Sequence, residues 1–204
     1  MEWIDIQSNL LNELISQVGN TQMTYQEYKF ISDTVYSING ANFLVFGTGR
    51  DSNLWLQSNK PGRTVFLEPD YNWLTIAKDA NPNIDIRHIE YNTRPDEALK
   101  LFIEYKRTGS FPKVPYVQDD ILNTEWDVIL IDSPVGAVNG RMSSIYLANK
   151  LANKTSKNVH IFLHDSQRDI EILYSSLFLA PGAKLIEEYN HTTNNFTTLN
   201  YYLK

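Results

Sequence analysis

Three ionisable side chains stand directly after two apolar segments of this 204-residue sequence. Asp132 follows the run Val128–Ile131, and His164 and Asp165 follow the run Val159–Leu163. A carboxylate at the end of a buried strand is costly to desolvate unless it binds something, so this placement indicates a functional site. Asp132 and His164 are both candidate general bases, and the imidazole has the pKa that is better matched to neutral solution.

The same residues support two other interpretations. Asp132 and Asp165 could hold a divalent metal ion that binds a hydroxyl group and lowers its pKa, and this interpretation is slightly favoured over the free base. Alternatively, the three side chains could only cap the helices that follow them. Their meeting at the ends of neighbouring strands favours a catalytic role over capping.

A glycine-containing turn and a later acid have the spacing of a nucleoside-binding site. Gly47 and Gly49 follow the apolar run Phe43–Phe46 and permit a tight turn that a ligand can approach closely. Glu68 ends the next apolar run, about twenty residues further on, where an acid accepts hydrogen bonds from ribose hydroxyls. The residues expected to contact the nucleoside are Phe46, Gly47, Thr48, Gly49, Asp51, Glu68 and Asp132.

The identity of the nucleoside follows from what the turn lacks. A dinucleotide site would place a third glycine where Ser52 and Asn53 stand. The turn also has no lysine of the kind that phosphate-binding loops use. A nucleoside without a pyrophosphate fits better, and by analogy with this fold we expect S-adenosylmethionine (SAM) rather than NAD.

The elements that must position these residues alternate between strands and helices. Strands are expected at residues 43–46, 64–67, 85–90, 128–131, 159–163, 184–189 and 196–203, with a further candidate at 114–117. Helices are expected at residues 2–18, 24–38 (opened by a capping box of Thr24 and Glu27), 52–59, 73–79, 95–105, 143–152 and 170–178.

This alternation predicts an α/β, Rossmann-like fold of the SAM-dependent methyltransferase type. A mostly parallel, seven-stranded sheet would bring the glycine turn and the strand-end acids to one edge. The short polar link between the last two strands predicts an antiparallel hairpin, which is typical of SAM methyltransferases, whereas NAD domains continue with parallel strands. We expect one domain over residues 1–204, with residues 1–40 as a helical cap.

Two further acids follow the candidate strand at residues 114–117. In a SAM-binding fold an acid at this place often contacts the adenine amino group, so Asp119 and Asp120 are candidate cofactor ligands. The alternative is that both are solvated loop residues.

Composition and charge exclude several classes of function. A net charge of −6 argues against general binding to nucleic acids or anionic membranes, which needs a basic face. No apolar run approaches the length of a membrane span and the first residues do not resemble a signal peptide, so we expect a soluble, cytoplasmic protein without membrane insertion. The absence of cysteine excludes disulfides and thiolate metal sites.

Five segments of the sequence resemble one known family. In order they are FLVFGTGRDSNLW, TVFLEPDYNW, EWDVILIDSP, NGRMSSIY and HIFLHDSQRDIE. They resemble the glucuronoxylan 4-O-methyltransferase family of plants, also known as DUF579 or the polysaccharide-biosynthesis domain, from about Asn42 to Asp165 and beyond. The resemblance implies SAM-dependent methylation of the 4-hydroxyl of glucuronic acid side chains on a polysaccharide.

The resemblance also implies roles for single residues. It suggests Gly47, Gly49 and Glu68 for SAM, and it places four residues around the reaction centre: Asp132, Arg141, His164 and Asp165. Arg50 departs from the histidine expected after the glycine turn. The sequence also lacks the amino-terminal anchor of the plant Golgi members and their cysteine-bearing insertion before EWD, which leaves the acceptor open, and the Golgi lumen as an alternative compartment.

Three arginines are candidates for binding an acidic acceptor. A net-acidic protein that methylates a uronic acid must neutralise the sugar carboxylate locally, and the guanidinium fork does this well. Arg141 begins a helix shortly after Asp132, and Arg50 and Arg168 follow other strand ends, so together they could form a clamp. The alternative is that they pair with acids at the surface, which we expect for Arg168 before Arg141.

Two rival functions stay open at this stage. The chain could be a SAM-dependent O-methyltransferase of another small molecule, such as a phenol or a free sugar acid. It could also be a non-catalytic relative that organises glycan assembly, although the intact Gly47, Gly49, Glu68 and Asp132 argue against this. The expected partner is a glucuronic acid-containing oligosaccharide or polysaccharide.

Overall fold

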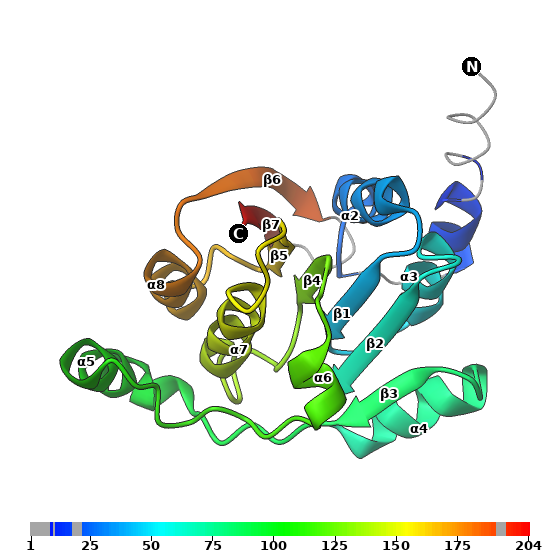
Figure 1. Ribbon diagram of the computed structural model, residues 1–204. Coiled ribbons are helices and arrows are strands. Elements are labelled where there is room, and N and C mark those ends of the chain that lie inside the picture. The colour runs from blue at the N-terminus through cyan, green and yellow to red at the C-terminus, as the bar shows by residue number, and fades with distance from the viewer. Residues whose placement is uncertain (1–8, 10, 18–21, 191–194) are drawn as a thin grey trace.

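The computed structural model describes residues 9, 11–17, 22–190 and 195–204 (Figure 1). Within the helix expected at residues 2–18, positions 11–17 are helical, and Leu11 and Leu14 are buried. The other positions of this expected helix, 2–8, 10 and 18, lie outside the described residues apart from residue 9, which is helical. None of the helices in the described ranges has both the length and the apolar character that crossing a membrane requires.

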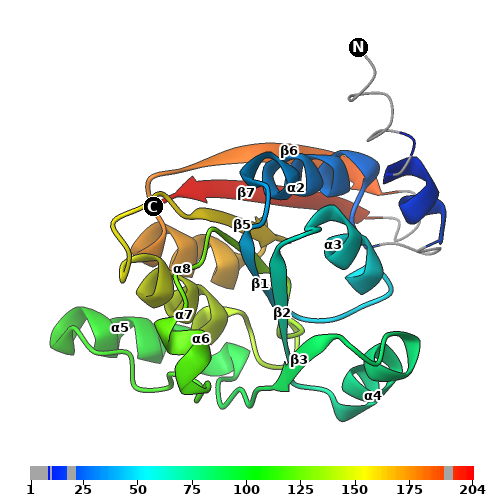
Figure 2. The ribbon, with the colours of Figure 1, turned by 45° about the vertical axis from the view of Figure 1, so that its right-hand side comes forward.

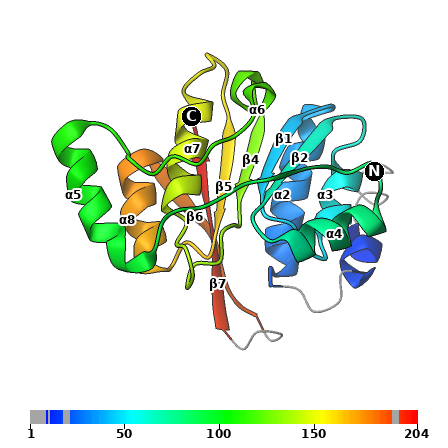
Figure 3. The same ribbon diagram turned by 90° about the horizontal axis from the view of Figure 1, so that it is seen from below.

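The described strands form one seven-stranded sheet in the order β3-β2-β1-β4-β5-β7-β6. Their bounds are β1 Asn42–Phe46, β2 Arg63–Glu68, β3 Asp85–His88, β4 Val128–Ile131, β5 His160–His164, β6 Gly182–Asn190 and β7 Asn195–Leu203. Strands β1 to β5 are parallel, and β7 runs antiparallel to both β5 and β6. The predicted parallel sheet with a terminal antiparallel hairpin is confirmed, and the hairpin projects past the other strands (Figure 3).

Helices cover both faces of the sheet (Figures 1 and 2). One face packs against α2 Tyr25–Ile38, α3 Ser52–Ser58 and α4 Tyr71–Ala80, and the other against α5 Ala98–Thr108, α7 Met142–Ala152 and α8 Asp169–Phe178. A 3₁₀ turn, Pro95–Glu97, leads into α5, and the short helix α6 spans Asp119–Asn123.

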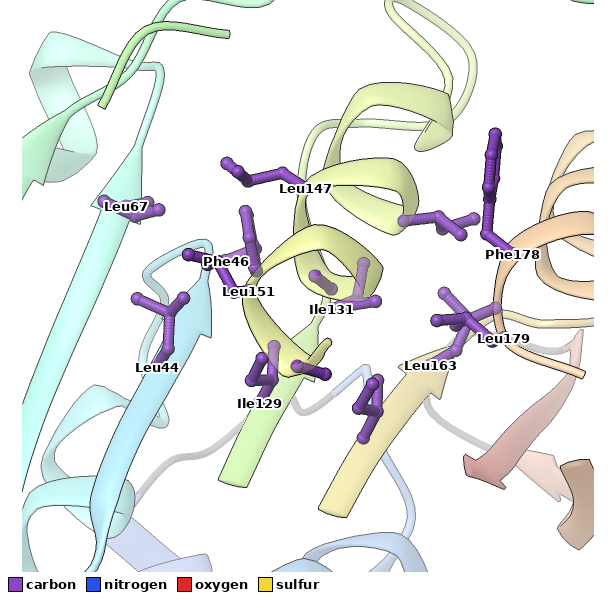
Figure 4. Packing of buried hydrophobic residues seen from close by; sticks show 14 of the residues in the cluster. Leu44, Phe46, Leu67, Ile129, Ile131, Leu147, Leu151, Leu163, Phe178 and Leu179 are labelled. Atoms are coloured by element: carbon purple, nitrogen blue, oxygen red, sulfur yellow. The ribbon is translucent and has the colours of Figure 1, made fainter. Parts of the chain in front are cut away.

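Alternate residues of the central strands enter two separate cores. Phe43 and Val45 of β1 pack in the core under α2 and α3, whereas Leu44 and Phe46 pack in the core under α7 and α8. Figure 4 shows the second core, where side chains from β1, β4 and β5 meet those of α7 and α8. Because both faces are covered, the parallel strands are continuous apolar runs, and their polar residues gather at the strand ends.

The prediction of a candidate strand at residues 114–117 is wrong. The segment is irregular and leads into α6. Pro115 has no backbone N–H to donate to a neighbouring strand, and the place beside β2 is taken by β3. Among the boundaries that differ, β3 ends at His88 and not at residue 90. Helix α5 continues past residue 105 until Gly109, in the left-handed conformation at φ 70°, ends it.

Candidate functional site

A cleft of about 460 Å³ opens where the strand order reverses, at the carboxyl ends of β1, β2 and β4. Aromatic rings from three helices line its sides: Tyr28, Trp55 and Trp73. The residues around the strand ends that line it are Gly47, Thr48, Gly49, Arg50, Asp51, Glu68, Pro69, Asp70, Asp132, Ser133 and Val135. The structure therefore brings the glycine turn, Glu68 and Asp132 together at one edge, in a space of the size that small-molecule sites have.

The glycine turn lies so close to the loop after β4 that a side chain there would crowd that loop. Gly47 has a φ of 108°, and a Cβ atom at this position would lie 3.0 Å from Ser133 Cβ. The backbone N–H of Gly47 donates to Leu67 O at 2.8 Å, and that of Asp132 donates to Phe46 O at 3.1 Å. Glycine at position 47 is thus required both by the backbone angle and by the close approach.

Glu68 stabilises the same turn. Its Oε2 atom accepts hydrogen bonds from Thr48 N and Thr48 Oγ1, both at 2.7 Å, and its Oε1 atom accepts from Asp70 N at 2.8 Å. Glu68 is buried, and burial raises the pKa of its carboxyl. A carboxylate can accept about four hydrogen bonds, so Glu68 can still bind a ligand hydroxyl in the cleft.

Arg141 joins the two acids that follow β4 and β5. Its Nη2 atom donates to Asp132 Oδ1 at 3.0 Å and to Asp165 Oδ2 at 3.1 Å. Its Nε atom donates to Pro134 O at 3.3 Å, and its Nη1 atom donates to His164 O. The side chain is 3% exposed and all three nitrogens are used within the protein. The prediction that Arg141 binds the acceptor carboxylate is therefore wrong for this arrangement.

His164 lies behind Asp132. Its Nδ1 atom is 2.8 Å from Asp132 Oδ1, its Nε2 atom is 2.9 Å from Thr197 Oγ1, and its side chain is 1% exposed. Asp132 is 25% exposed and lines the cleft, whereas His164 does not. Of the two candidate bases, Asp132 is the one that can touch a molecule in the cleft.

Neighbouring charges set the protonation of this cluster. Burial acts to raise the pKa of Asp132, but the charges of His164 and Arg141 outweigh burial and lower it. Burial acts to lower the pKa of His164, but the charges of Asp132, Asp165 and Glu27 raise it to about 8. At neutral pH the cluster therefore pairs a carboxylate at Asp132 with an imidazolium at His164.

Carboxylates dominate the charge of the cleft. Asp51, Glu68, Asp70 and Asp132 line it, and Arg50 is the one basic residue among the described residues that do so. Burial, and then the charge of Asp132, raise the pKa of Asp51 to about 6. The cleft therefore favours a cationic ligand over an anionic one.

The other two predicted arginines differ in whether they form an ion pair within the protein. Arg50 is exposed at the cleft, and within the described ranges it makes no ion pair. Arg168 is 43% exposed and pairs with Asp165 at 2.6 Å, so the surface pairing that was the alternative for this residue is confirmed.

Asp119 and Asp120 do not reach the cleft. Asp120 pairs at 2.9 Å with Arg63, the first residue of β2, which lies at the edge of the sheet opposite to Glu68. The prediction that these acids contact the adenine is wrong, because the strand that was to deliver them to the ligand edge does not exist.

The cluster also contains the expected metal ligands. Donor atoms of Asp132, His164 and Asp165 lie within 4.8 Å of one another. Arg141 Nη2, however, already binds both carboxylates, and a protonated imidazole cannot bind a metal. A divalent cation at this place would have to displace the guanidinium of Arg141 and the Nδ1 proton of His164.

Sequence reasoning missed three residues of the site. Tyr28 was expected on the inner face of its helix, as a core or lid residue, but its hydroxyl donates to Asp51 Oδ2 at 3.3 Å. Glu27 was expected only as a helix cap, and Thr197 was one residue of a predicted strand. A carboxylate and a hydroxyl on elements that pack against the end of β5 could have been found only once the order of the strands was known.

Comparison with known proteins identifies related chains. A family model described as IRX15/IRX15L/GXM matches residues 26–194. The chain is 32% identical over 205 residues to Glucuronoxylan 4-O-methyltransferase 3 of Arabidopsis thaliana, covering 93% of this chain and 68% of that protein. It is 34% identical over 185 residues to Arabinogalactan O-methyltransferase 2 of the same plant, covering 80% of this chain and 63% of that protein.

A solved structure supports the same fold. The O-methyltransferase from Bacillus cereus in complex with SAH superposes with a TM-score of 0.56 at 15% identity, covering 95% of this chain and 90% of that one. At this identity the likeness concerns the fold alone. Together with the strand order, it confirms the predicted Rossmann-like methyltransferase fold.

Proposed function

The chain belongs to the IRX15/IRX15L/GXM family, and on that premise we propose that it methylates a glycan hydroxyl with SAM as the donor. The acceptor that we propose is the 4-hydroxyl of a glucuronosyl unit in an oligosaccharide or polysaccharide. The names of both Arabidopsis relatives support a polysaccharide acceptor, and one of them specifies 4-O-methylation of glucuronoxylan.

The carboxylate-lined cleft is the observation that carries this proposal. SAM has a cationic sulfonium and a cationic ammonium group and no phosphate, so its charge complements Asp51, Glu68 and Asp132. A dinucleotide would bring a pyrophosphate against the same acids. The close backbone approach at Gly47 suits the adenosyl group, and Glu68 has acceptor capacity left for a ribose hydroxyl.

Asp132 is the residue that we propose as the proton acceptor. When bound, SAM supplies a methyl group activated by its sulfonium, and the products are the methyl ether, S-adenosylhomocysteine and one proton. The lowered pKa of Asp132 keeps its carboxylate ionised and able to orient the acceptor hydroxyl. It is a weak base, but the hydroxyl becomes strongly acidic as its oxygen gains a bond to carbon, so a weak base suffices. The proton then passes from Asp132 to solvent through the cleft.

Arg50 is the residue that we propose for binding the sugar carboxylate, in place of Arg141. It is exposed, it lines the cleft, and no acid of the described residues pairs with it. Its guanidinium can therefore form the two-pronged contact that a carboxylate prefers. Arg168 could add a second contact from its exposed side.

Methyl-transfer assays on a matched pair of sugars test the proposal. Wild type should methylate a glucuronic acid-containing oligosaccharide in strong preference to the same sugar with its carboxylate reduced to an alcohol. Arg50→Gln should lose this preference, and Arg107→Gln, an exposed arginine on α5, should keep it. Equal rates of wild type on both sugars would rule out carboxylate recognition. Calorimetric binding of SAM without transfer to either sugar would rule out the acceptor but not the cofactor.

A further inference from the structure

We infer that Glu27 and Thr197 are positioning residues for the reaction: a buried hydrogen-bond path from α2 through β7 fixes the ring of His164 and, through it, the carboxylate of Asp132. The inference rests on the proposed methyl transfer, in which Asp132 is the group at the cleft. Glu27, Thr197 and His164 are 0%, 3% and 1% exposed, so the path is shielded from solvent.

The direction of each hydrogen bond on this path follows from donor and acceptor chemistry. Glu27 Oε2 accepts from Thr24 N at 2.7 Å, and Glu27 Oε1 accepts from Thr197 Oγ1 at 3.0 Å. A hydroxyl has one proton, so Thr197 Oγ1 can only accept from His164 Nε2, 2.9 Å away. The Nε2 atom of His164 therefore keeps its hydrogen, and Nδ1 is the ring atom that forms the hydrogen bond with Asp132 Oδ1 at 2.8 Å.

Helix capping alone does not explain Glu27. The capping box with Thr24 is confirmed, but it uses only Oε2. An acid in the first turn of a helix ordinarily keeps its other oxygen in water, and burying a carboxylate completely is costly unless it is paired. Here the second oxygen points to Thr197 and lies 3.8 Å from His164 Nε2. Burial raises the pKa of Glu27, and the charge of His164 offsets part of this effect.

The path joins elements that are far apart in the sequence. α2 precedes the first strand of the sheet, whereas β7 is its last strand, and the two meet behind the end of β5. A second bond supports this junction, since Asn190 Nδ2 of the hairpin donates to Gln22 O at 2.9 Å, just before α2. Two elements that do not carry the glycine turn or the strand-end acids thus set the orientation of the reacting carboxylate.

Three conservative variants separate this role from a structural one. Thr197→Val removes the hydroxyl at nearly constant volume, and Thr197→Ser, its matched control, retains it. Glu27→Gln keeps the cap, because glutamine also serves in a capping box. Its amide N–H₂ would donate to Thr197, which would then donate to His164 Nε2, so the path would run in the opposite direction.

Nitrogen-15 spectra of the histidine rings locate the hydrogens of His164 without any acceptor sugar, and a His164→Gln variant assigns its signals among the four histidines. Wild type and Thr197→Ser should show a solvent-protected Nε2–H. Glu27→Gln should lose this hydrogen, because Nε2 becomes an acceptor. In Thr197→Val the Nε2–H should exchange rapidly, since its partner is gone.

Kinetics test whether the path matters for turnover. Thr197→Val and Glu27→Gln should lower kcat by about 10–100-fold, the effect expected when a residue that orients a functional group is lost, with KM for SAM nearly unchanged. Thr197→Ser should retain most of the wild-type kcat. An unaltered Nε2–H in Glu27→Gln, or wild-type kcat in Thr197→Val, would overturn the inference. If wild type binds SAM but methylates no glucuronosyl sugar, the proposed function fails. The ring spectra would still show whether the hydrogen-bond path from Glu27 through Thr197 to His164 exists.

Discussion

Asp132 is the residue at which the cleft and the buried cluster meet. Arg141 and His164 both donate to its Oδ1 atom, and the side chain lines the cleft. Two cationic donors on one oxygen hold the group as an anion and leave Oδ2 for a ligand hydroxyl. At the scale of single residues, the protonation state of Asp132 is therefore set by the cations that lie behind its carboxylate.

We expect Asp132→Asn to lower kcat by about 10²–10⁴-fold, the usual contribution of a general base, with little change in SAM affinity. The amide cannot take up a proton, but it has nearly the same shape. Initial rates and calorimetry measure the two effects. Asp120→Asn, at the opposite edge of the sheet, is the control and should behave as wild type. Full activity in Asp132→Asn would show that the proton leaves by another route.

Arg141 neutralises the two strand-end acids and so would compete with any divalent cation added to the protein. Arg141→Met keeps the bulk of the side chain but leaves Asp132 and Asp165 without their shared cation, which should cost about 3–5 kcal/mol of folding stability. Added Mn²⁺ should recover part of this loss by binding between the carboxylates. The measurement is the Tm of both proteins with Mn²⁺ and with EDTA, and an equal response of wild type and variant would contradict the competition.

At the scale of elements, the turn between β1 and α3 depends on glycine for two separable reasons. Gly47 has a positive φ, and it also packs against the loop after β4. Gly40, in the turn before β1, has a similar φ of 100°, but a Cβ atom added there would have no atom of the described residues within 4 Å apart from those of its chain neighbours. The two glycines therefore form a natural pair for separating backbone strain from close packing.

Both Gly40→Ala and Gly47→Ala should lose about 1 kcal/mol or more of stability to backbone strain. Only Gly47→Ala should also lose SAM affinity, because its methyl group would push the turn away from Ser133 and narrow the cleft. Urea denaturation and calorimetry on the two variants make the comparison. Comparable SAM affinity in both would mean that the turn does not approach the ligand.

The sequence was sufficient for the elements whose pattern is local. The apolar runs of β1, β2, β4 and β5 predicted the sheet, and therefore the meeting of the glycine turn with Asp132. The candidate strand at residues 114–117 failed because a short alternation of apolar residues does not report whether a place in the sheet is free. The role of Arg141 could not be predicted, because two of its partners are backbone carbonyls brought close only by folding.

At the scale of the whole molecule, the charged cluster links the site to global stability. A group whose pKa is higher in the folded state than in the unfolded state favours folding at low pH, and this contribution disappears as pH rises through the folded pKa. The pKa of Asp51 is about 6, so most of its contribution has disappeared by the time the pH has risen to neutral. The pKa of His160 is lowered by burial, so this residue titrates below 6.5. Of these three groups, only His164 has a pKa above 6.5.

The free energy of unfolding of wild type should fall by about 1.5 kcal/mol as pH rises from 6.5 to 9, because the folded protein holds the His164 proton with a pKa of about 8 against 6.5 for an ordinary histidine. Urea denaturation at closely spaced pH values measures the decrease. His164→Gln should be less stable at pH 6.5 but should lack this pH dependence, since no proton is lost at that position. His88→Gln, a histidine outside the cluster that stacks on Tyr71, is the control and should keep the wild-type slope. The same slope in wild type and in His164→Gln would mean that the imidazolium at the centre of the cluster does not stabilise the fold.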